Sequence, residues 1–215
     1  MENLFMFEPE KYWDFTAKYT SEEKEQEIKN RILSGEYIAS LKKDGDYSRP
    51  TKYNGEVRLI TRSLSTVTHE YGRKEDHVPH ITEKIKKLPD NTILIGELYY
   101  PGKTSQDVAT ILRCKADKAA ARQLTPEYGL VHLYLHDIWY NNGECLFEVP
   151  YSERIDILTN IYNQYLNGTD FIELAQYART PSEITEMLNF AFENDEEGIV
   201  MVRADATVAL GKRTA

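Results

Sequence analysis

The 215-residue sequence has little cysteine, no long apolar run and no excess of basic residues. Its two cysteines, Cys114 and Cys145, are too few for a disulfide scaffold or a zinc cluster. No window approaches the roughly 20 apolar residues of a membrane-spanning helix, and the first residues lack the pattern of a secretory signal. We therefore expect a soluble, intracellular protein without a membrane partner.

The net charge of −9 at pH 7 is of the wrong sign for extensive contact with DNA. Proteins that bind DNA over a large area are usually basic, because their lysines and arginines displace counterions from the phosphates. Basic residues do gather locally in 42–74 and 103–123, whereas acidic residues dominate 20–27 and 192–198. The charge therefore excludes a uniformly basic surface and leaves local contact with nucleic acid open.

Two familiar nucleotide-binding fingerprints are also absent. Neither GxGxxG nor GxxxxGK[ST] occurs, so any ATP that binds is not held by a P-loop. His77 and His80 have a spacing that could hold a metal, but no cysteine or third histidine stands nearby, and we favour isolated histidines. No internal repeat, low-complexity tract or linker divides the chain, so we treat residues 1–215 as one domain.

Apolar spacing and capping signals predict a mixture of helices and strands. The predicted helices cover 20–33 (closed by Gly35), 80–88, 105–124 as one or two helices, 151–166, and 182–194 with Ser182 as N-cap; the predicted strands cover 37–42, 55–63, 91–101, 130–140, 171–179 and 197–204. We expect strands 37–42 and 55–63 to pair as antiparallel neighbours. The order has no strict βαβ rhythm, which favours an α+β fold with antiparallel sheets.

The end of the first predicted strand, LKKDG, combines residues that suit covalent chemistry. Alternation places Lys42 and Asp44 on one side, and Gly45 lets the backbone turn sharply or approach a ligand. A lysine attacks only as the neutral amine, so it needs desolvation or neighbouring cations such as Lys43, Arg49 and Arg62. Taken alone, the same residues also fit a charged hairpin turn.

Three further segments place ionisable groups in apolar strands. Glu97 interrupts ILIGELYY, His136 and Asp137 fall late in LYLHDIWY, and Glu197 begins a strand that ends at Arg203. A buried carboxylate is costly unless it is paired or lies in a cleft with polar or metal partners. Glu197 and Arg203 share parity, so we expect both on one face of the strand. Each group alone would also fit a satisfied structural residue.

In this order the segments resemble the ATP-dependent DNA ligases, which belong to the covalent nucleotidyltransferase superfamily together with RNA ligases and mRNA capping enzymes. The matching positions are Lys42, Asp44, Gly45, Arg62, Ser63, Glu97, His136, Asp137, Glu197 and Gly198. The resemblance covers about 37–213, and GELYYPGKTSQDVATILRCKADKAAARQ is particularly similar to bacteriophage-type ligases. It implies an α+β adenylation domain with antiparallel sheets flanked by helices.

The resemblance also implies the chemistry. Lys42 would attack the α-phosphate of ATP to form lysyl-AMP, and the AMP would pass to the 5′-phosphate of nicked double-stranded DNA before strand sealing. The implied nucleotide-binding residues are Leu41, Lys42, Asp44, Gly45, Arg62, Glu97, His136, Glu197 and Arg203. Glu97 and Glu197 are candidates for Mg²⁺ or ribose, because Mg²⁺ prefers carboxylates with phosphate oxygens and water. Arg62 would contact ribose or phosphate.

The purine requires a stacking face, and here the sequence departs from the family. His136 stands where the family usually has phenylalanine, with Tyr134 and Trp139 as alternatives. Tyr47 replaces the arginine commonly found five residues after the lysine, and Arg49, of the same parity, is a candidate substitute.

The end of the sequence is a further departure. Lys212 lies in the approach to the family's last lysine motif, and the chain stops at Ala215. We therefore expect the chain to end before that motif and the OB-fold domain, to retain partial ATP binding, to self-adenylate slowly and to seal nicks very weakly. The alternatives are an RNA ligase, a capping-type nucleotidyltransferase, or a catalytically impaired nucleotide- or DNA-binding module. We expect a monomer in the cytoplasm of a bacterial or phage-infected cell, although the sequence does not fix the oligomeric state.

Overall fold

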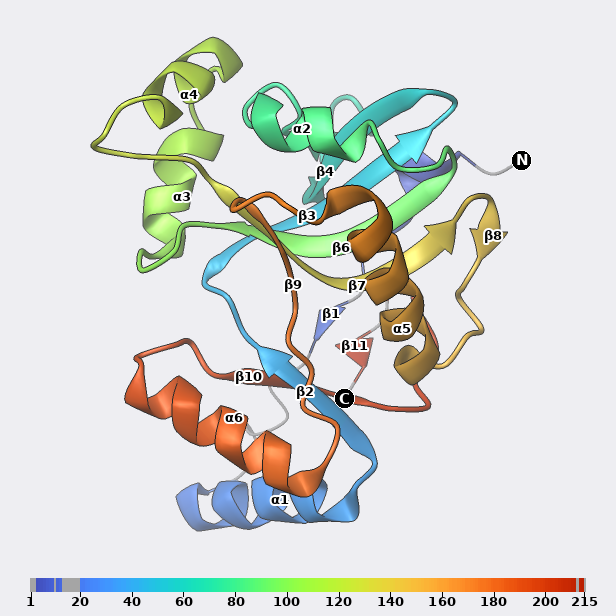
Figure 1. The fold of residues 1–215 in the computed structure, drawn as a ribbon, viewed down its shortest axis with the longest axis vertical. Coiled ribbons are helices and arrows are strands. Elements are labelled where there is room, and N and C mark those ends of the chain that lie inside the picture. The colour runs from blue at the N-terminus through green and yellow to red at the C-terminus, as the bar shows by residue number, and fades with distance from the viewer. Residues whose placement is uncertain (1–2, 10, 13–19, 212, 215) are drawn as a thin grey trace.

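The computed structural model describes residues 3–9, 11–12, 20–211 and 213–214, so Lys212 lies outside the described residues. Figure 1 shows a large antiparallel sheet with helices α2 to α5 around it, and below it a two-stranded sheet that packs with helices α1 and α6. Antiparallel sheets flanked by helices match the α+β fold expected from the sequence. Within the described residues, no helix has both the length and the apolar character needed to cross a membrane.

The large sheet has seven strands in the order β5-β4-β3-β6-β7-β8, with β9 parallel to β7. These strands are β3 (Gly45–Tyr53), β4 (Glu56–Leu64), β5 (Tyr71–Arg73), β6 (Thr92–Tyr99), β7 (His132–Asn141), β8 (Glu144–Cys145) and β9 (Ile172–Leu174). The central strand β6 is almost wholly apolar because both of its faces are covered. Its Glu97 is therefore exceptional among its neighbours and lies directly opposite Tyr47 of β3 and Tyr134 of β7.

Four helices cover the large sheet and bury its main core. They are α2 (Pro79–Ile85), α3 (Ser105–Leu112), α4 (Ala116–Gln123) and α5 (Tyr151–Ile161), the last continued by a π-helical turn over Tyr162–Leu166. Their apolar residues pack with the strands in one cluster that includes Leu59, Leu94, Ile111, Leu133 and Leu158. Burial of this amount of apolar surface supplies most of the driving force for folding.

The small sheet pairs β2 (Tyr37–Leu41) with β10 (Ile199–Arg203), and helices α1 (Ser21–Ser34) and α6 (Pro181–Glu193) pack against it. Thr20 and Glu23 form a capping box at the start of α1, and Gly35 ends the helix with a φ of 69°. The prediction of Ser182 as the cap of α6 was wrong. Thr180 is the N-cap, because its hydroxyl accepts from the Glu183 backbone and Glu183 returns the contact.

The predicted pairing of strands 37–42 and 55–63 was also wrong. The first strand pairs with β10, and the second pairs with β3, a strand that the sequence analysis did not identify. Asn54 and Gly55 both have positive φ, 52° and 76°, and form the tight hairpin turn that joins β3 to β4. Three short elements complete the described fold: a 3₁₀ turn at Leu4–Met6, and β1 (Lys11–Tyr12), which pairs in parallel with β11 (Arg213–Thr214).

Candidate active site

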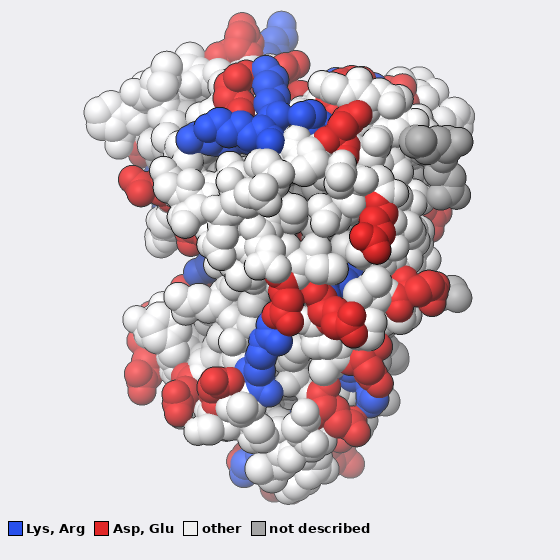
Figure 2. Space-filling model, turned by 45° about the vertical axis from the view of Figure 1, so that its right-hand side comes forward, with Lys and Arg blue, Asp and Glu red and all other residues white. Residues whose placement is uncertain are grey.

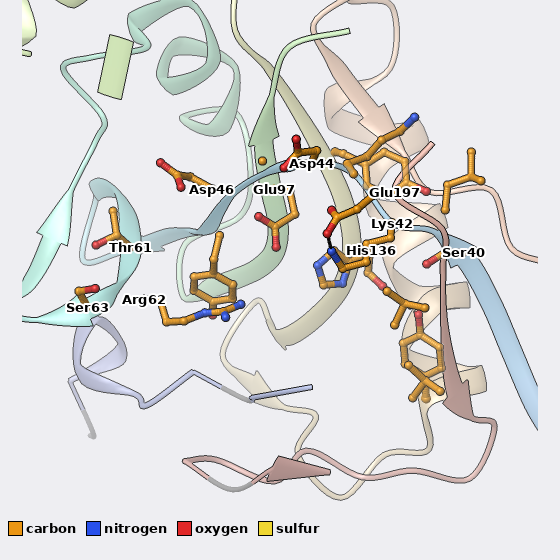
Figure 3. A pocket seen from close by; sticks show the side chains of 18 of the residues that line it. Ser40, Lys42, Asp44, Asp46, Thr61, Arg62, Ser63, Glu97, His136 and Glu197 are labelled. Atoms are coloured by element: carbon orange, nitrogen blue, oxygen red, sulfur yellow. Dashed lines mark hydrogen bonds and ion pairs between the residues drawn. The ribbon is translucent and has the colours of Figure 1, made fainter. Parts of the chain in front are cut away.

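A cavity of about 640 Å³ lies between the two sheets. Figure 3 shows its side chains converging from both sides, with Lys42 and Glu197 on one side and Glu97 and Arg62 on the other. The lining residues are Ser40, Leu41, Lys42, Lys43, Asp44, Gly45, Asp46, Tyr47, Thr61, Arg62, Ser63, Glu97, Arg113, Tyr134, His136, Tyr151, Glu197, Val200 and Val202. All but one of the nucleotide-binding residues expected from the sequence are therefore brought together here.

Lys42 occupies the junction between the two sheets, directly after β2. Its backbone N–H donates to the Gly198 carbonyl at 2.9 Å, which continues the pairing with the β10 side. Gly198 has a φ of 132°, which favours glycine at that position. The Lys42 amino group makes an ion pair with Glu197, drawn in Figure 3, and 45% of the lysine side chain remains exposed. The amine is thus held in the cavity and open to a ligand.

The neighbouring Lys43 is engaged elsewhere. Its Nζ lies 3.0 Å from Oε1 of Glu196, and only 14% of its side chain is exposed. It also lies 5.4 Å and 5.7 Å from the ring centroids of Tyr99 and Tyr134. This ion pair and the ring contacts hold Lys43 in place, so the structure distinguishes the two adjacent lysines.

Asp44 and Gly45 line the cavity, and both also fix the position of the backbone around it. The Asp44 carboxylate accepts from the Ser105 backbone N–H at 2.9 Å, at the start of α3. A Cβ atom on Gly45 would lie 2.4 Å from the Leu98 carbonyl oxygen. Gly45 is therefore required by the close approach of β3 to β6.

Glu97 is the half-buried acid at the floor of the site. Burial raises its pKa to about 7, while Arg62 and Lys42 act in the opposite direction and Asp46 adds to the rise. A carboxyl with this pKa exchanges its proton near neutral pH. A bound cation would favour its ionised form, so the group suits a metal or a polar ligand.

Tyr47, at the position where the resemblance implies an arginine, contributes an aromatic ring to the cavity. The guanidinium of Arg62 lies 5.2 Å from the ring centroid of Tyr47, so Tyr47 supports the cation that enters from β4. Arg49 does not substitute for the missing arginine, because it is 1% exposed and its guanidinium donates to the backbone carbonyls of Phe5 and Phe7. It is therefore committed to the 3₁₀ turn at the N-terminal end of the described chain.

His136 and Asp137 point in different directions. His136 lines the cavity, and burial lowers its pKa. Arg62 lowers this pKa further, whereas Asp137 raises it. Asp137 is 1% exposed and makes two 2.9 Å hydrogen bonds with the guanidinium of Arg154 on α5. Of the two alternative stacking residues, Tyr134 lines the cavity, whereas Trp139 packs in a separate apolar cluster.

Arg203 is the expected nucleotide-binding residue that the structure does not bring to the cavity. Its guanidinium pairs with Glu36 at 2.8 Å and Asp205 at 3.0 Å on the surface. The parity argument failed because Glu197 precedes β10, and the strand faces the cavity with Val200 and Val202. Several lining residues were missed, among them Arg113, for which no local sequence pattern gives a signal.

The cavity offers carboxylates but no cluster of protein ligands for a metal among the described residues. No group of three or more His, Cys, Asp or Glu close enough to hold a metal occurs in the described ranges. His77 and His80 each contact a backbone carbonyl, of Cys114 at 3.0 Å and of Val131 at 2.9 Å. Glu97 and Glu197 face each other across the cavity (Figure 3), and Mg²⁺ is usually bound by one or two carboxylates with phosphate and water.

Charge is unevenly distributed over the surface. Figure 2 shows basic side chains gathered in one group at the end of the molecule that carries α2 and α4, with acidic side chains over the lower part of that face. The face drawn in Figure 2 therefore carries charge of both signs.

An exposed lysine, carboxylates and an arginine line one cavity, an arrangement that suits an anionic ligand. Residues 15–215 match the family model described as the ATP dependent DNA ligase domain, which is most of the chain. The chain therefore belongs to the ATP-dependent DNA ligase domain family.

Curated relatives agree with this assignment. The chain is 27% identical to a DNA ligase of Sulfolobus acidocaldarius over 173 residues, covering 79% of this chain and 27% of that protein. It is 32% identical to a DNA ligase of Methanococcus vannielii over 167 residues, covering 74% and 26%. The chain thus spans about a quarter of the length of these relatives.

The structural comparisons support the fold. A mycobacterial DNA ligase D complexed with ATP and MES has a TM-score of 0.65 at 16% identity, covering 99% of this chain and 59% of that one. The ATP-dependent DNA ligase of bacteriophage T7, in complex with ATP, has a TM-score of 0.60 at 16% identity, covering 98% and 67%. The expectation of a specifically bacteriophage-type ligase stays a prediction.

Proposed function

We propose that residues 1–215 form the adenylation domain of an ATP-dependent DNA ligase, with Lys42 as the nucleophile. The Lys42 amine forms a bond to the α-phosphorus of ATP, the bond from that phosphorus to pyrophosphate breaks, and the amine loses its proton to solvent. The product is a lysyl-AMP phosphoramidate. The observation that carries this proposal is the exposed Lys42 amino group in the cavity, contrasted with Lys43, which Glu196 holds.

The walls of the cavity suit the rest of the nucleotide. His136 and Tyr134 offer ring faces from β7, and Val200 and Val202 offer an apolar surface from β10 for the purine. Arg62, supported by Tyr47, offers a fork of donors to ribose or phosphate oxygens.

We assign Glu97 and Glu197 as the carboxylates that would hold Mg²⁺ or contact the ribose. When bound there, Mg²⁺ supplies positive charge that stabilises the phosphate oxygens. Glu197 also holds the Lys42 amino group before the nucleotide arrives, so ligand binding must replace or rearrange that ion pair.

The second step is the transfer of AMP from Lys42 to the 5′-phosphate of nicked double-stranded DNA. The phosphate oxygen forms a bond to the AMP phosphorus and the P–N bond breaks, returning the amine. Family membership supports this step, and we place it in the joining of nicks during DNA replication or repair in the cytoplasm of a bacterial or phage-infected cell.

The first step can be tested directly by incubating the chain with α-labelled ATP and Mg²⁺. The wild-type chain should acquire label and gain the mass of one adenylate. Lys42→Ala should acquire none, whereas the matched neighbour Lys43→Ala should still carry the adduct. Label that persists after Lys42→Ala would remove the nucleophile assignment, and a wild-type chain that never acquires label would refute the proposed function.

A further inference from the structure

Four cationic side chains line the cavity, and their contacts differ. Lys42 pairs with Glu197, Lys43 pairs with Glu196, and Arg62 lies over the Tyr47 ring. Arg113 is exposed, and among the described lining cations it alone makes no side-chain ion pair or ring contact. A cation without a counter-charge that lines a cavity is available to an anionic ligand.

The backbone that carries Arg113 is anchored on both sides. The Lys74 ammonium donates to the carbonyl of Leu112, and Nε2 of His77 donates to the carbonyl of Cys114 at 3.0 Å. The Arg113 N–H itself donates to the Ala109 carbonyl at 3.0 Å as α3 ends. Three hydrogen bonds therefore hold this short turn, and the guanidinium is carried on a fixed base.

Arg113 caps the C-terminal end of α3, and the chain segment that carries Lys42 contacts the N-terminal end of the same helix through Asp44. The helix begins at Ser105, whose N–H donates to Asp44, two residues beyond Lys42. The eight residues of α3 span about 12 Å at 1.5 Å per residue. A ligand that contacts both Lys42 and Arg113 therefore extends along α3.

We propose that Arg113 binds the terminal 5′-phosphate of a nicked DNA duplex as it enters the cavity. A terminal phosphate carries nearly two negative charges near neutral pH, and the planar guanidinium can donate two parallel hydrogen bonds to its oxygens. Arg113 is exposed and lines the same cavity as Lys42 and Glu97, so a polynucleotide end that reaches Lys42 can also reach its guanidinium. This assignment rests on the proposed DNA ligase function.

The test compares two fluorescent nicked duplexes that differ only in a 5′-phosphate or a 5′-hydroxyl at the nick. Their binding to the 215-residue chain is measured by anisotropy at low salt with EDTA, so that no transfer takes place. The wild-type chain should prefer the phosphorylated nick by about tenfold, the effect expected of a charged bidentate contact. Arg113→Ala should remove most of that preference, and Arg113→Lys should retain part of it.

Lys118→Ala is the matched control, because Lys118 is an exposed cation on the adjacent helix α4 and its removal changes the net charge equally. It should keep the wild-type preference. A preference that survives Arg113→Ala, or one that is absent from the wild-type chain, overturns the proposal.

A second measurement separates DNA from the triphosphate of ATP as the source of the phosphate. Binding of a non-hydrolysable ATP analogue is measured for the same variants. Should Arg113→Ala weaken analogue binding while the preference for the phosphorylated nick remains, Arg113 contacts the triphosphate and the proposal is wrong. The adenylate adduct on the wild-type chain is scored separately, so failure of the ligase assignment is distinguished from failure of the Arg113 assignment.

Discussion

Replacement of Glu97 by glutamine should make the protein more resistant to unfolding at alkaline pH. The pKa of Glu97 rises from 4.5 to about 7 because the folded chain buries the carboxyl. Between these two values the folded state holds a proton that the unfolded state has released. The free energy of unfolding therefore falls as pH rises from about 4.5 to 7, and Glu97 is most destabilising above pH 7.

The size of the effect follows from the two pKa values. A shift of 2.5 units, the difference between 7 and 4.5, corresponds to about 3 kcal/mol at 1.36 kcal/mol per unit. Glutamine has a similar shape and does not titrate. The unfolding free energy of Glu97→Gln minus that of the wild type should therefore increase by about 2 to 3 kcal/mol from pH 5 to pH 8.

Urea unfolding in metal-free buffer at several pH values measures this difference. Glu144→Gln, an exposed carboxylate on β8, is the matched control, and its difference from wild type should not change with pH. A Glu97→Gln difference that stays constant from pH 5 to pH 8 would refute the assignment of an elevated pKa. The same variant should lose lysyl-AMP formation, because the carboxylate proposed for Mg²⁺ or ribose is gone.

Three other substitutions give independent tests. Gly45→Ala should destabilise the protein by about 1 to 3 kcal/mol in urea unfolding, because the new methyl group would collide with the Leu98 carbonyl; an unchanged midpoint would show that β3 can move away. Asp137→Asn should destabilise by about 3 to 5 kcal/mol in the same assay, because Arg154 keeps a buried charge without its anion, and a loss below about 1 kcal/mol would contradict this. His136→Phe should bind ATP severalfold more tightly by calorimetry at pH 7.5, because phenylalanine offers more apolar stacking area; weaker binding would indicate that a ring nitrogen of the histidine bonds the purine.

The sequence predicts the helices and most strands because their signals are local. The capping pattern at Thr20 and the glycine at 35 place α1 correctly, since both act within one turn. The polar strand β3 was missed because its stability comes from pairing with β4 and β6 on either side. The Asn54–Gly55 dipeptide was the available signal, as it is the common turn of a two-residue hairpin.

The candidate site was predictable where each residue stands at a strand end or interrupts an apolar run. Lys42, Glu97 and His136 belong to this group, and all three line one cavity. The prediction that Arg203 shares a face with Glu197 was wrong, because side chains alternate regularly only within a continuous strand and β10 begins after Glu197. Arg113 could not be foreseen, because long-range packing of α3 against β3 and β6 brings it to the cavity.

The position of Lys42 between the two sheets has a mechanical consequence. The lysine is joined to the small sheet through β2 and to the large sheet through β3, while Glu197 approaches from the β10 side and Glu97 from β6. Any change in the angle between the sheets must therefore alter the distances from the Lys42 amine to the two carboxylates unequally. A nucleotide that contacts both Val202 and Arg62 would fix that angle, because its two ends would be bound by different sheets. If Lys42 is the nucleophile, binding of such a ligand and alignment of the amine would be coupled through the same junction.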